Sequence, residues 1–231
     1  MQLIKNKKIE DNDVYYFRIY KNFIIINNNY EGVKFLNSEL KVIKNIYVIN
    51  DLHIHSDCFV DNKLILHCSE NNCLAYIDIK DFTVNIINIP ICYNVVSIKP
   101  CNNIENIIFR TSMGKEYIMN INNKNIIRHY NEKESNKSDL IASQLIVDEN
   151  INYSIENPEF LVSNNSIKIA YNERNVEVID TIKNETHIIK TYEEWIYRRV
   201  EIYDLLSDIY IYILENNNYY AKKSKLICYK I

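Results

Sequence analysis

The feature that most constrains this chain is a regular alternation of short apolar runs and polar turns, which continues from end to end. Each run has the length of a β-strand and is rich in Ile, Val, Tyr and Phe, residues that favour a pleated, half-buried surface. Clusters of Asn, Asp, Ser and Lys separate the runs. A pattern of this kind leaves little room for helices, so we expect an all-β fold.

The runs fall into successive groups, and each group repeats the order of strand, tight turn, apolar strand, turn and strand. A similar ending recurs in several groups, as in Tyr76–Ile79, Met119–Ile121 and Val178–Asp180. The expected strand groups span residues 15–43, 57–87, 95–128, 159–190 and 209–229.

A period of about 40 residues with four strands in each period is the spacing of propeller blades. In this pattern, over nearly its whole length, the chain resembles the β-propeller superfamily. It has no WD dipeptide, Gly-His or kelch Gly-Gly signature. The resemblance implies a single β-propeller-like domain over residues 1–231, with about five four-stranded blades. Because the last group is short, we expect the N-terminal strand around Val14–Ile19 to complete it and close the ring.

The chain has only two glycines, Gly32 and Gly114, and three prolines, so its turns need another residue type. Asn tolerates the left-handed backbone conformation and forms local side-chain turns. We therefore expect Asn to replace Gly in many turns. An AT-rich gene is a compatible explanation for the abundance of Ile, Asn, Lys and Tyr.

Two stretches interrupt the strand pattern. Residues 131–139 are charged and polar, which predicts a solvated loop, and the segment 140–146 after them fits either a helical turn or a strand. Residues 192–206 carry apolar side chains at helical spacing, which predicts a short helical insert between the last two blades. We expect both inserts on one rim of a propeller, where binding loops usually lie.

Composition excludes several classes of function. Hydrophobic residues make up 47% and charged residues 25% of the chain, enough for a sizeable core. A formal net charge of −3 provides no overall basic field for nucleic acid or an anionic membrane. The basic N-terminus is followed by no apolar run, and about 18 consecutive apolar residues occur nowhere. We expect a cytoplasmic protein that is a monomer alone, with no membrane contact and no direct binding of nucleic acid.

The six cysteines are expected to stay reduced and to behave mainly as small buried apolar residues. Cys68 and Cys73 have no second pair at zinc-ribbon spacing, so they give only a weak indication of a metal site.

The sharpest local motif is Asp51-Leu52-His53-Ile54-His55-Ser56. Two histidines two residues apart on a strand point the same way and can bind one metal ion. The motif resembles the first motif of the PHP phosphoesterases and, more faintly, the His-x-His-x-Asp-His of metallo-β-lactamase folds, which Cys58 breaks. The resemblance implies an alternative function, a metal-dependent hydrolase or phosphoesterase using His53 and His55.

Other catalytic patterns are missing from the sequence. There is no Gly-x-Ser-x-Gly, and the two glycines form no phosphate-binding loop. Paired carboxylates such as Glu193 and Glu194 are neighbours in sequence, which is typical of solvated charge. The main prediction is therefore a protein without enzymatic activity and without a cofactor.

A rigid all-β scaffold that is acidic on balance and carries rim inserts is best explained as a protein-binding module. In composition and architecture the chain resembles the immunity proteins of bacterial toxin–immunity pairs. The resemblance implies that an acidic rim covers the basic cleft of a nuclease toxin, with an aromatic anchor. The candidate contact residues are the acidic and aromatic residues of the two inserts: Glu132, Glu134, Asp139, Glu193, Glu194, Trp195 and Tyr197.

Overall fold

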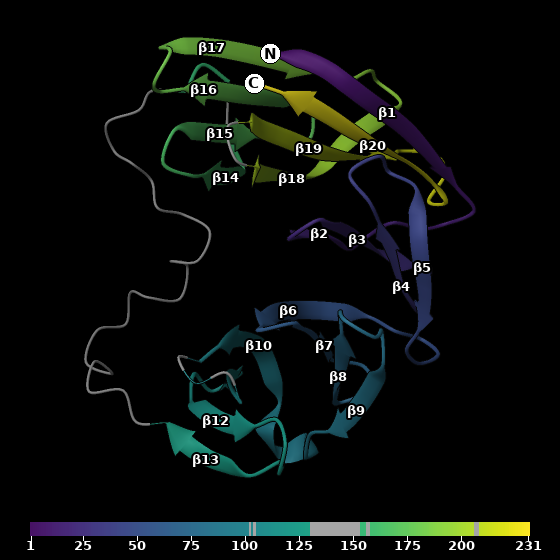
Figure 1. The fold of residues 1–231 in the computed structure, drawn as a ribbon, viewed down its shortest axis with the longest axis vertical. Coiled ribbons are helices and arrows are strands. Elements are labelled where there is room, and N and C mark those ends of the chain that lie inside the picture. The colour runs from purple at the N-terminus through teal and green to yellow at the C-terminus, as the bar shows by residue number, and fades with distance from the viewer. Residues whose placement is uncertain (102, 104, 130–152, 156–157, 206–207) are drawn as a thin grey trace. The chain divides into compact units, whose positions relative to one another are not determined.

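The computed structural model describes residues 1–231 except 102, 104, 130–152, 156–157 and 206–207 (Figure 1). Within the described residues, regular structure consists of strands and one 3₁₀ turn at Ile91–Tyr93. The prediction of an all-β fold is confirmed. The segment predicted as loop and helical turn or strand at 131–146 lies outside the described residues, and so do Glu132, Glu134 and Asp139.

The described strands form five four-stranded sheets, and the pairings are antiparallel. The first sheet holds β2 (Phe17–Tyr20), β3 (Phe23–Asn28), β4 (Gly32–Leu36) and β5 (Val42–Tyr47), and the second β6 (Ile54–Val60), β7 (Lys63–Cys68), β8 (Cys73–Asp78) and β9 (Val84–Asn88). The third holds β10 (Val95–Pro100), β11 (Asn106–Thr111), β12 (Glu116–Asn120) and β13 (Ile126–His129), and the fourth β14 (Phe160–Ser163), β15 (Ile167–Tyr171), β16 (Asn175–Asp180) and β17 (Glu185–Lys190). The fifth holds β18 (Trp195–Leu205), β19 (Asp208–Asn217), β20 (Lys223–Lys230) and β1 (Gln2–Glu10). The number of strand groups and their size agree with the sequence prediction.

The chain divides into two compact units. Unit 1 comprises Met1–Asn29, Val33–Asn45 and Ser138–Ile231, and unit 2 comprises Tyr30–Gly32 and Ile46–Lys137. The fourth and fifth sheets and most of the first belong to unit 1, while the second and third belong to unit 2. That residues 1–231 form a single domain stays a prediction.

Inside each unit, sheets stack face to face like propeller blades. In unit 2 an apolar core joins the second sheet to the third through Tyr76, Ile87, Phe109 and Met119. In unit 1, separate cores join the fourth sheet to the fifth and the fifth to the first. The first strands of stacked sheets are also neighbours, because β6 lies beside β10, and β18 lies beside β14 and β2. Each sheet thus has the strand number, order and packing of a β-propeller blade.

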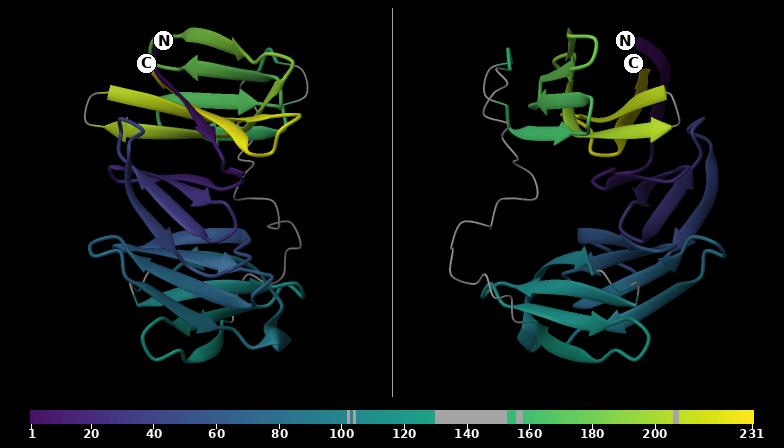
Figure 2. Two further views of the ribbon diagram at one scale, coloured as in Figure 1. Left: turned by 90° about the vertical axis from the view of Figure 1, so that its right-hand side faces the viewer. Right: turned by 60° about the vertical axis from the view of Figure 1, so that its left-hand side comes forward.

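The fifth sheet unites the two ends of the chain. β1 pairs antiparallel with β20, so the N-terminal and C-terminal strands run side by side (Figures 1 and 2). The expectation that an N-terminal strand completes the last sheet is correct, but the strand is Gln2–Glu10 and not Val14–Ile19. β1 has few buried apolar residues, since among its nine residues only Ile9 is buried. Because β1 is rich in lysine and poor in buried apolar residues, the sequence pattern did not identify it as a strand.

Residues Trp195–Leu205 form strand β18 and not the predicted helical insert near 192–206. A β-bulge interrupts the pairing of β18 with β19 between Tyr197 and Arg199. A bulge adds one residue to a strand, so Tyr197 and Val200 stand three residues apart and still reach the same core. This spacing of three imitates a helix in the sequence, which explains why the predicted helix is wrong.

Asn side chains and left-handed Asn residues build many of the turns, as predicted. Asn29, Asn72, Asn94 and Asn184 adopt positive φ angles of 41–55°. Asn164 shows the second role, because its Oδ1 accepts from the main-chain N–H groups of Ser166 at 3.0 Å and Ile167 at 2.6 Å. The recurring strand endings have the same explanation: the side chains of Asp78, Asn120 and Asp180 accept main-chain N–H groups two or three residues ahead.

Candidate protein-binding surface

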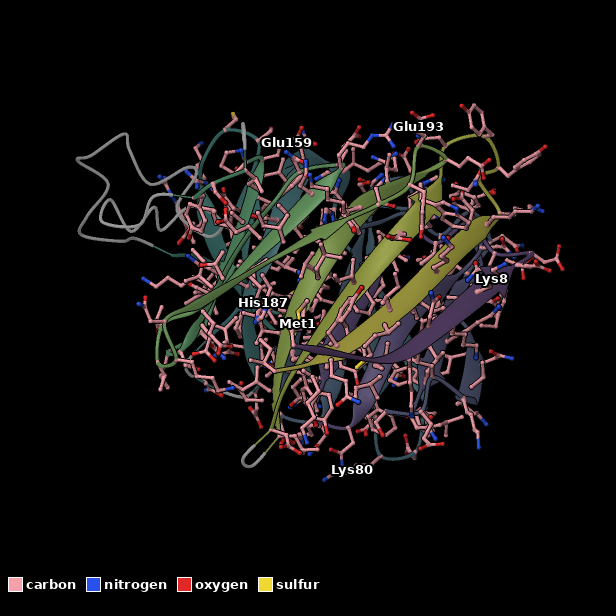
Figure 3. The ribbon with its side chains drawn as sticks, turned by 90° about the horizontal axis from the view of Figure 1, so that it is seen from above. Met1, Lys8, Lys80, Glu159, His187 and Glu193 are labelled. Atoms are coloured by element: carbon pink, nitrogen blue, oxygen red, sulfur yellow. The ribbon has the colours of Figure 1, made fainter. Side chains whose placement is uncertain are left out.

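Three turns of unit 1 meet at one end of the fourth and fifth sheets. They are residues 172–174 between β15 and β16, 191–194 between β17 and β18, and 217–220 at the β19–β20 turn. We name these residues the tyrosine–glutamate cluster. The main-chain N–H of Thr191 donates to the carbonyl of Arg174 at 3.2 Å, and that of Asn218 donates to the carbonyl of Glu194 at 2.8 Å. Figure 3 labels Glu193 in this region, beside the yellow β19–β20 turn.

Arg174 connects two of these turns through hydrogen bonds from its side chain, which we name the Arg174 strap. Its Nη1 donates to the carbonyls of Glu193 at 2.9 Å and Trp195 at 3.0 Å, with a longer contact of 3.3 Å to that of Tyr192. The Asn218 side chain adds a hydrogen bond of 3.2 Å to the Glu193 carbonyl. Hydrogen bonds from a charged donor are stronger than neutral ones. The backbone of the cluster is therefore held in place while its side chains face solvent.

The exposed side chains of the cluster are mainly aromatic and acidic. Tyr192 is 80% exposed, Tyr219 73% and Tyr220 60%. Glu193 and Glu194, which follow Tyr192 in the sequence, are exposed as well. Tyr provides a large contact area at a low cost in conformational entropy, and its hydroxyl group can hydrogen-bond. The combination offers apolar contact and negative charge on one surface.

Several cationic side chains lie in and beside the same turns, and Lys222 among them is exposed. Arg198 forms an ion pair with Glu173 at 3.5 Å, and Lys223 Nζ lies 4.6 Å from the centre of the Tyr220 ring. Arg174 is occupied by the main-chain carbonyls. Glu193 and Glu194, in contrast, form no ion pair with any of the described residues. Glu193 and Glu194 thus have no ion-pair partner among the described residues, although Arg174, Lys222 and Lys223 add positive charge to the same turns.

Trp195 and Tyr197, the predicted aromatic anchors, differ from expectation. The Trp195 ring is half-buried and carries Lys225 Nζ at 3.5 Å from its centre. Lys225 also pairs with the buried carboxylate of Glu215 at 3.5 Å. Tyr197 is only 3% exposed and belongs to the apolar core, where burial raises the pKa of its hydroxyl. Tyr197 is therefore a core residue, and the choice of it as a surface anchor is corrected.

Sequence reasoning missed the exposed tyrosines. The expected strand group 209–229 includes them, whereas the chain turns there and the Asn217 side chain accepts from the N–H groups of Tyr219 and Tyr220 at 2.9 and 3.1 Å. The run Asn216-Asn217-Asn218 before them is a turn signal that could have located them.

Unit 2 contains turns with the same main-chain connections and different side chains. The N–H of Ile89 donates to the carbonyl of Asn72 at 2.8 Å, and that of Ser112 donates to the carbonyl of Asn94 at 3.0 Å. These bonds correspond to those of Thr191 and Asn218 in unit 1. The first joins the residue after a fourth strand to the turn between the second and third strands of the same sheet, and the second joins such a turn to the residue before the first strand of its sheet. The most exposed large apolar side chains here are Ile91 at 77% and Met113 at 71%. The repeated scaffold therefore carries a tyrosine and glutamate surface in one unit and an aliphatic one in the other.

His53 and His55, the candidate metal ligands, have different ring partners. His53 is exposed just before β6 and lies 4.9 Å from the Tyr30 ring between centres. His55 lies 5.8 Å from the His67 ring. Burial lowers the pKa of His67 to about 4, with a smaller contribution from His55. No group of three or more His, Cys, Asp or Glu side chains suited to a metal ion occurs among the described residues.

The cysteines are free thiols, and Cys58, Cys68, Cys73 and Cys228 are buried, while Cys92 is exposed. In the described part of the chain, no helix is long and apolar enough to span a membrane.

No protein-family model and no curated protein sequence matches the chain. Among solved structures, the β-propeller domain of Cps50 (Swd1) from Myceliophteria thermophila is 11% identical, with a TM-score of 0.45 over 90% of this chain and 66% of that one. Virginiamycin B lyase from Staphylococcus aureus is 12% identical, with a TM-score of 0.49 over 97% of this chain and 99% of that one. The computationally designed Ika8 protein is 8% identical, with a TM-score of 0.40 over 92% and 57%. The chain spans less than two thirds of the Cps50 domain and of Ika8.

Proposed function

We propose that this protein is a non-catalytic protein-binding module whose tyrosine–glutamate cluster binds a basic surface of another protein. The observation that carries the proposal is the presence of two carboxylates without an ion-pair partner, Glu193 and Glu194, among exposed tyrosines on a hydrogen-bonded scaffold. A surface whose backbone is already ordered loses less conformational entropy on binding. Tyr and Asn are also enriched in the recognition loops of antibodies.

The sign of the charge selects the class of partner. Opposite potentials on two surfaces accelerate association and disfavour partners of like charge. Proteins that act on nucleic acid have basic clefts, because they contact a polyanionic backbone. We therefore infer a basic toxin, such as a nuclease, as the partner, and the role of an immunity protein that neutralises it. Glu132, Glu134 and Asp139 remain in the proposed contact set on sequence grounds alone.

The test reverses the charge of the cluster. The partner is captured from the native host with the wild-type chain, identified by mass spectrometry and purified. Its affinity is then measured by calorimetry for wild type and for the double variant Glu193→Lys/Glu194→Lys. The proposal predicts that the double variant binds about 100-fold more weakly, equivalent to about 2.7 kcal/mol.

Glu185→Lys is the matched control, because Glu185 is an exposed carboxylate at the other end of β17. It should leave the affinity within about twofold of wild type, as expected for surface charge outside a contact. Equal losses in the control and the double variant would contradict a specific role of the cluster. A purified partner whose toxic activity is unaffected by excess wild-type chain would refute the immunity role and leave the binding role intact.

A further inference from the structure

Unit 1 also contains a groove lined mainly by lysines. It runs between β1 and the loop that follows β4, and its volume is about 580 Å³. Its lining consists of Lys5, Asn6, Lys7, Lys8, Glu39, Leu40 and Lys41. Figure 3 labels Lys8 on the purple strand β1. The groove is open to solvent over most of its extent.

The alternation of side chains along β1 directs two lysines into this groove. Ile9 is buried in the core with Leu40, and residues two and four positions before it on a strand face the same side. Lys7 Nζ accordingly donates to the Leu40 carbonyl, and Lys5 Nζ lies 3.4 Å from the Ser38 carbonyl. The lysine stems thus cover the edge of the core and leave their ammonium groups at its rim.

The loop that forms the other wall has a defined conformation. Leu40 has a φ of 58°, in the left-handed region, although it is not a glycine. The Asn37 side chain accepts from the Lys41 N–H at 2.9 Å, and the Leu40 N–H donates to the Asn37 carbonyl at 2.8 Å. Burial of the Leu40 side chain holds this turn against the core. The groove is therefore built from ordered parts on both sides.

Positive charge exceeds negative charge in the groove. Glu39 is the only carboxylate in the lining, and it contacts both Lys5 at 3.3 Å and Lys41 at 3.7 Å. Lys5 lowers the pKa of Glu39 through a hydrogen bond and through its charge. Lys34 on neighbouring β4 has a lowered pKa because of partial burial and the nearby charge of Lys7. The lysines of this region therefore repel one another, and an additional anion would relieve the repulsion.

We propose that this groove binds a compact multivalent oxyanion of the pyrophosphate type. Lysine ammonium groups are strong point-charge ligands for phosphate, and each has three hydrogen-bond donors. Glu39 already occupies an anion position between Lys5 and Lys41, which shows where a phosphate group fits. The lining contains no aromatic residue on which a nucleobase could stack, so a small polyphosphate fits better than single-stranded nucleic acid.

The test is a calorimetric titration of the full chain with inorganic pyrophosphate, at an ionic strength of about 0.05 M, where screening is weak. Wild type should bind with measurable heat, and Lys7→Gln should weaken the affinity about tenfold. Glu39→Gln should strengthen it by about threefold to tenfold, because it removes the competing carboxylate. Thermal unfolding of each variant establishes that it is folded.

Two control variants carry the same charge changes elsewhere in unit 1. Lys190 and Glu159 are exposed and distant in sequence from the groove, and Lys190→Gln and Glu159→Gln should each leave the affinity unchanged. The proposal is overturned if wild type shows no binding, or if the controls shift the affinity as much as the groove variants. It is also overturned if an oligonucleotide of equal charge binds and pyrophosphate does not, since that result indicates a polyelectrolyte surface.

Discussion

The turn clusters of the two units share a backbone and differ in side chains. In unit 1, the N–H groups of Thr191 and Asn218 bind carbonyls of the preceding turns, and in unit 2 those of Ile89 and Ser112 do the same. Unit 1 adds the Arg174 strap and exposes Tyr and Glu. Unit 2 exposes Ile91 and Met113. The comparison teaches that the repeat specifies a scaffold, while a few solvent-facing positions specify what the scaffold recognises.

The largest expected effect is on partner binding. Tyr192→Ala or Tyr220→Ala should cost about 2–3 kcal/mol of binding free energy, because truncated aromatic anchors at an interface lose their buried contact area. The corresponding change in unit 2, Ile91→Ala, should cost under about 0.5 kcal/mol. Surface plasmon resonance with the purified partner measures both. A larger loss for Ile91→Ala would assign binding to unit 2.

One buried group in each unit should give the free energy of unfolding an opposite dependence on pH. In unit 2, the folded pKa of His67 is about 4, below its usual 6.5. Its contribution to stability is therefore complete above pH 6.5 and is lost as pH falls toward 4. In unit 1, burial raises the pKa of Glu201 from 4.5 to about 7, opposed by Arg18. Its contribution is complete below pH 4.5 and is lost as pH rises through 7.

Urea unfolding of wild type and His67→Gln at pH 7 and pH 5 measures the first effect. Wild type should lose about 1–2 kcal/mol more than the variant on acidification. For Glu201, wild type should lose a similar amount of free energy of unfolding as the pH rises from 5 to 8. Glu201→Gln should not show this loss. Identical pH profiles for wild type and both variants would show that neither buried group titrates as described.

A smaller effect on stability should come from the Arg174 strap. Arg174→Ala removes charged hydrogen bonds to the turn at 192–195, which should lower the free energy of unfolding by about 1–2 kcal/mol. Arg174→Lys should recover only part of this, because the lysine ammonium lies one bond closer to the backbone than Arg174 Nη1 does. Hydrogen exchange should locate the change in residues 191–194. An unchanged exchange rate there would show that the strap does not order the turn.

The smallest effect concerns the exposed ion pair of Glu173 and Arg198 in the same region. Arg198→Ala should change the free energy of unfolding by less than about 0.5 kcal/mol, as is usual for an exposed pair. Chemical denaturation measures it beside Arg174→Ala. A loss equal to that of Arg174→Ala would contradict the distinction between hydrogen bonds that order the backbone of a turn and a solvated ion pair.

Strand groups could be predicted because apolar runs and Asn-rich turns are local signals. Asp78 and Asp180 illustrate this, since each ends a third strand by accepting N–H groups from the following turn. The failures have tertiary causes. The bulge in β18 gave Tyr197 and Val200 a helical spacing, and β1 is a lysine-rich edge strand recognisable only beside β20.

The sequence predicted the exposure of the acidic residues of the candidate surface, but it predicted the exposure of its aromatic residues only in part. Glu193 and Glu194 are exposed as expected, because adjacent carboxylates at a turn remain solvated. Tyr197 could not be placed correctly, since the face of a residue near a bulge depends on the partner strand. Tyr219 was missed because a tyrosine pair favours strand by propensity, and the Asn217 side chain overrides that preference.

The most direct test of the central claim is hydrogen exchange of the chain with and without its purified partner. The account predicts that binding protects residues 172–174, 191–194 and 217–220, and leaves the matching turns at 69–72, 89–94 and 112–115 unchanged. Protection confined to the turns of unit 2, with the tyrosine–glutamate cluster exchanging as in the free chain, would contradict it.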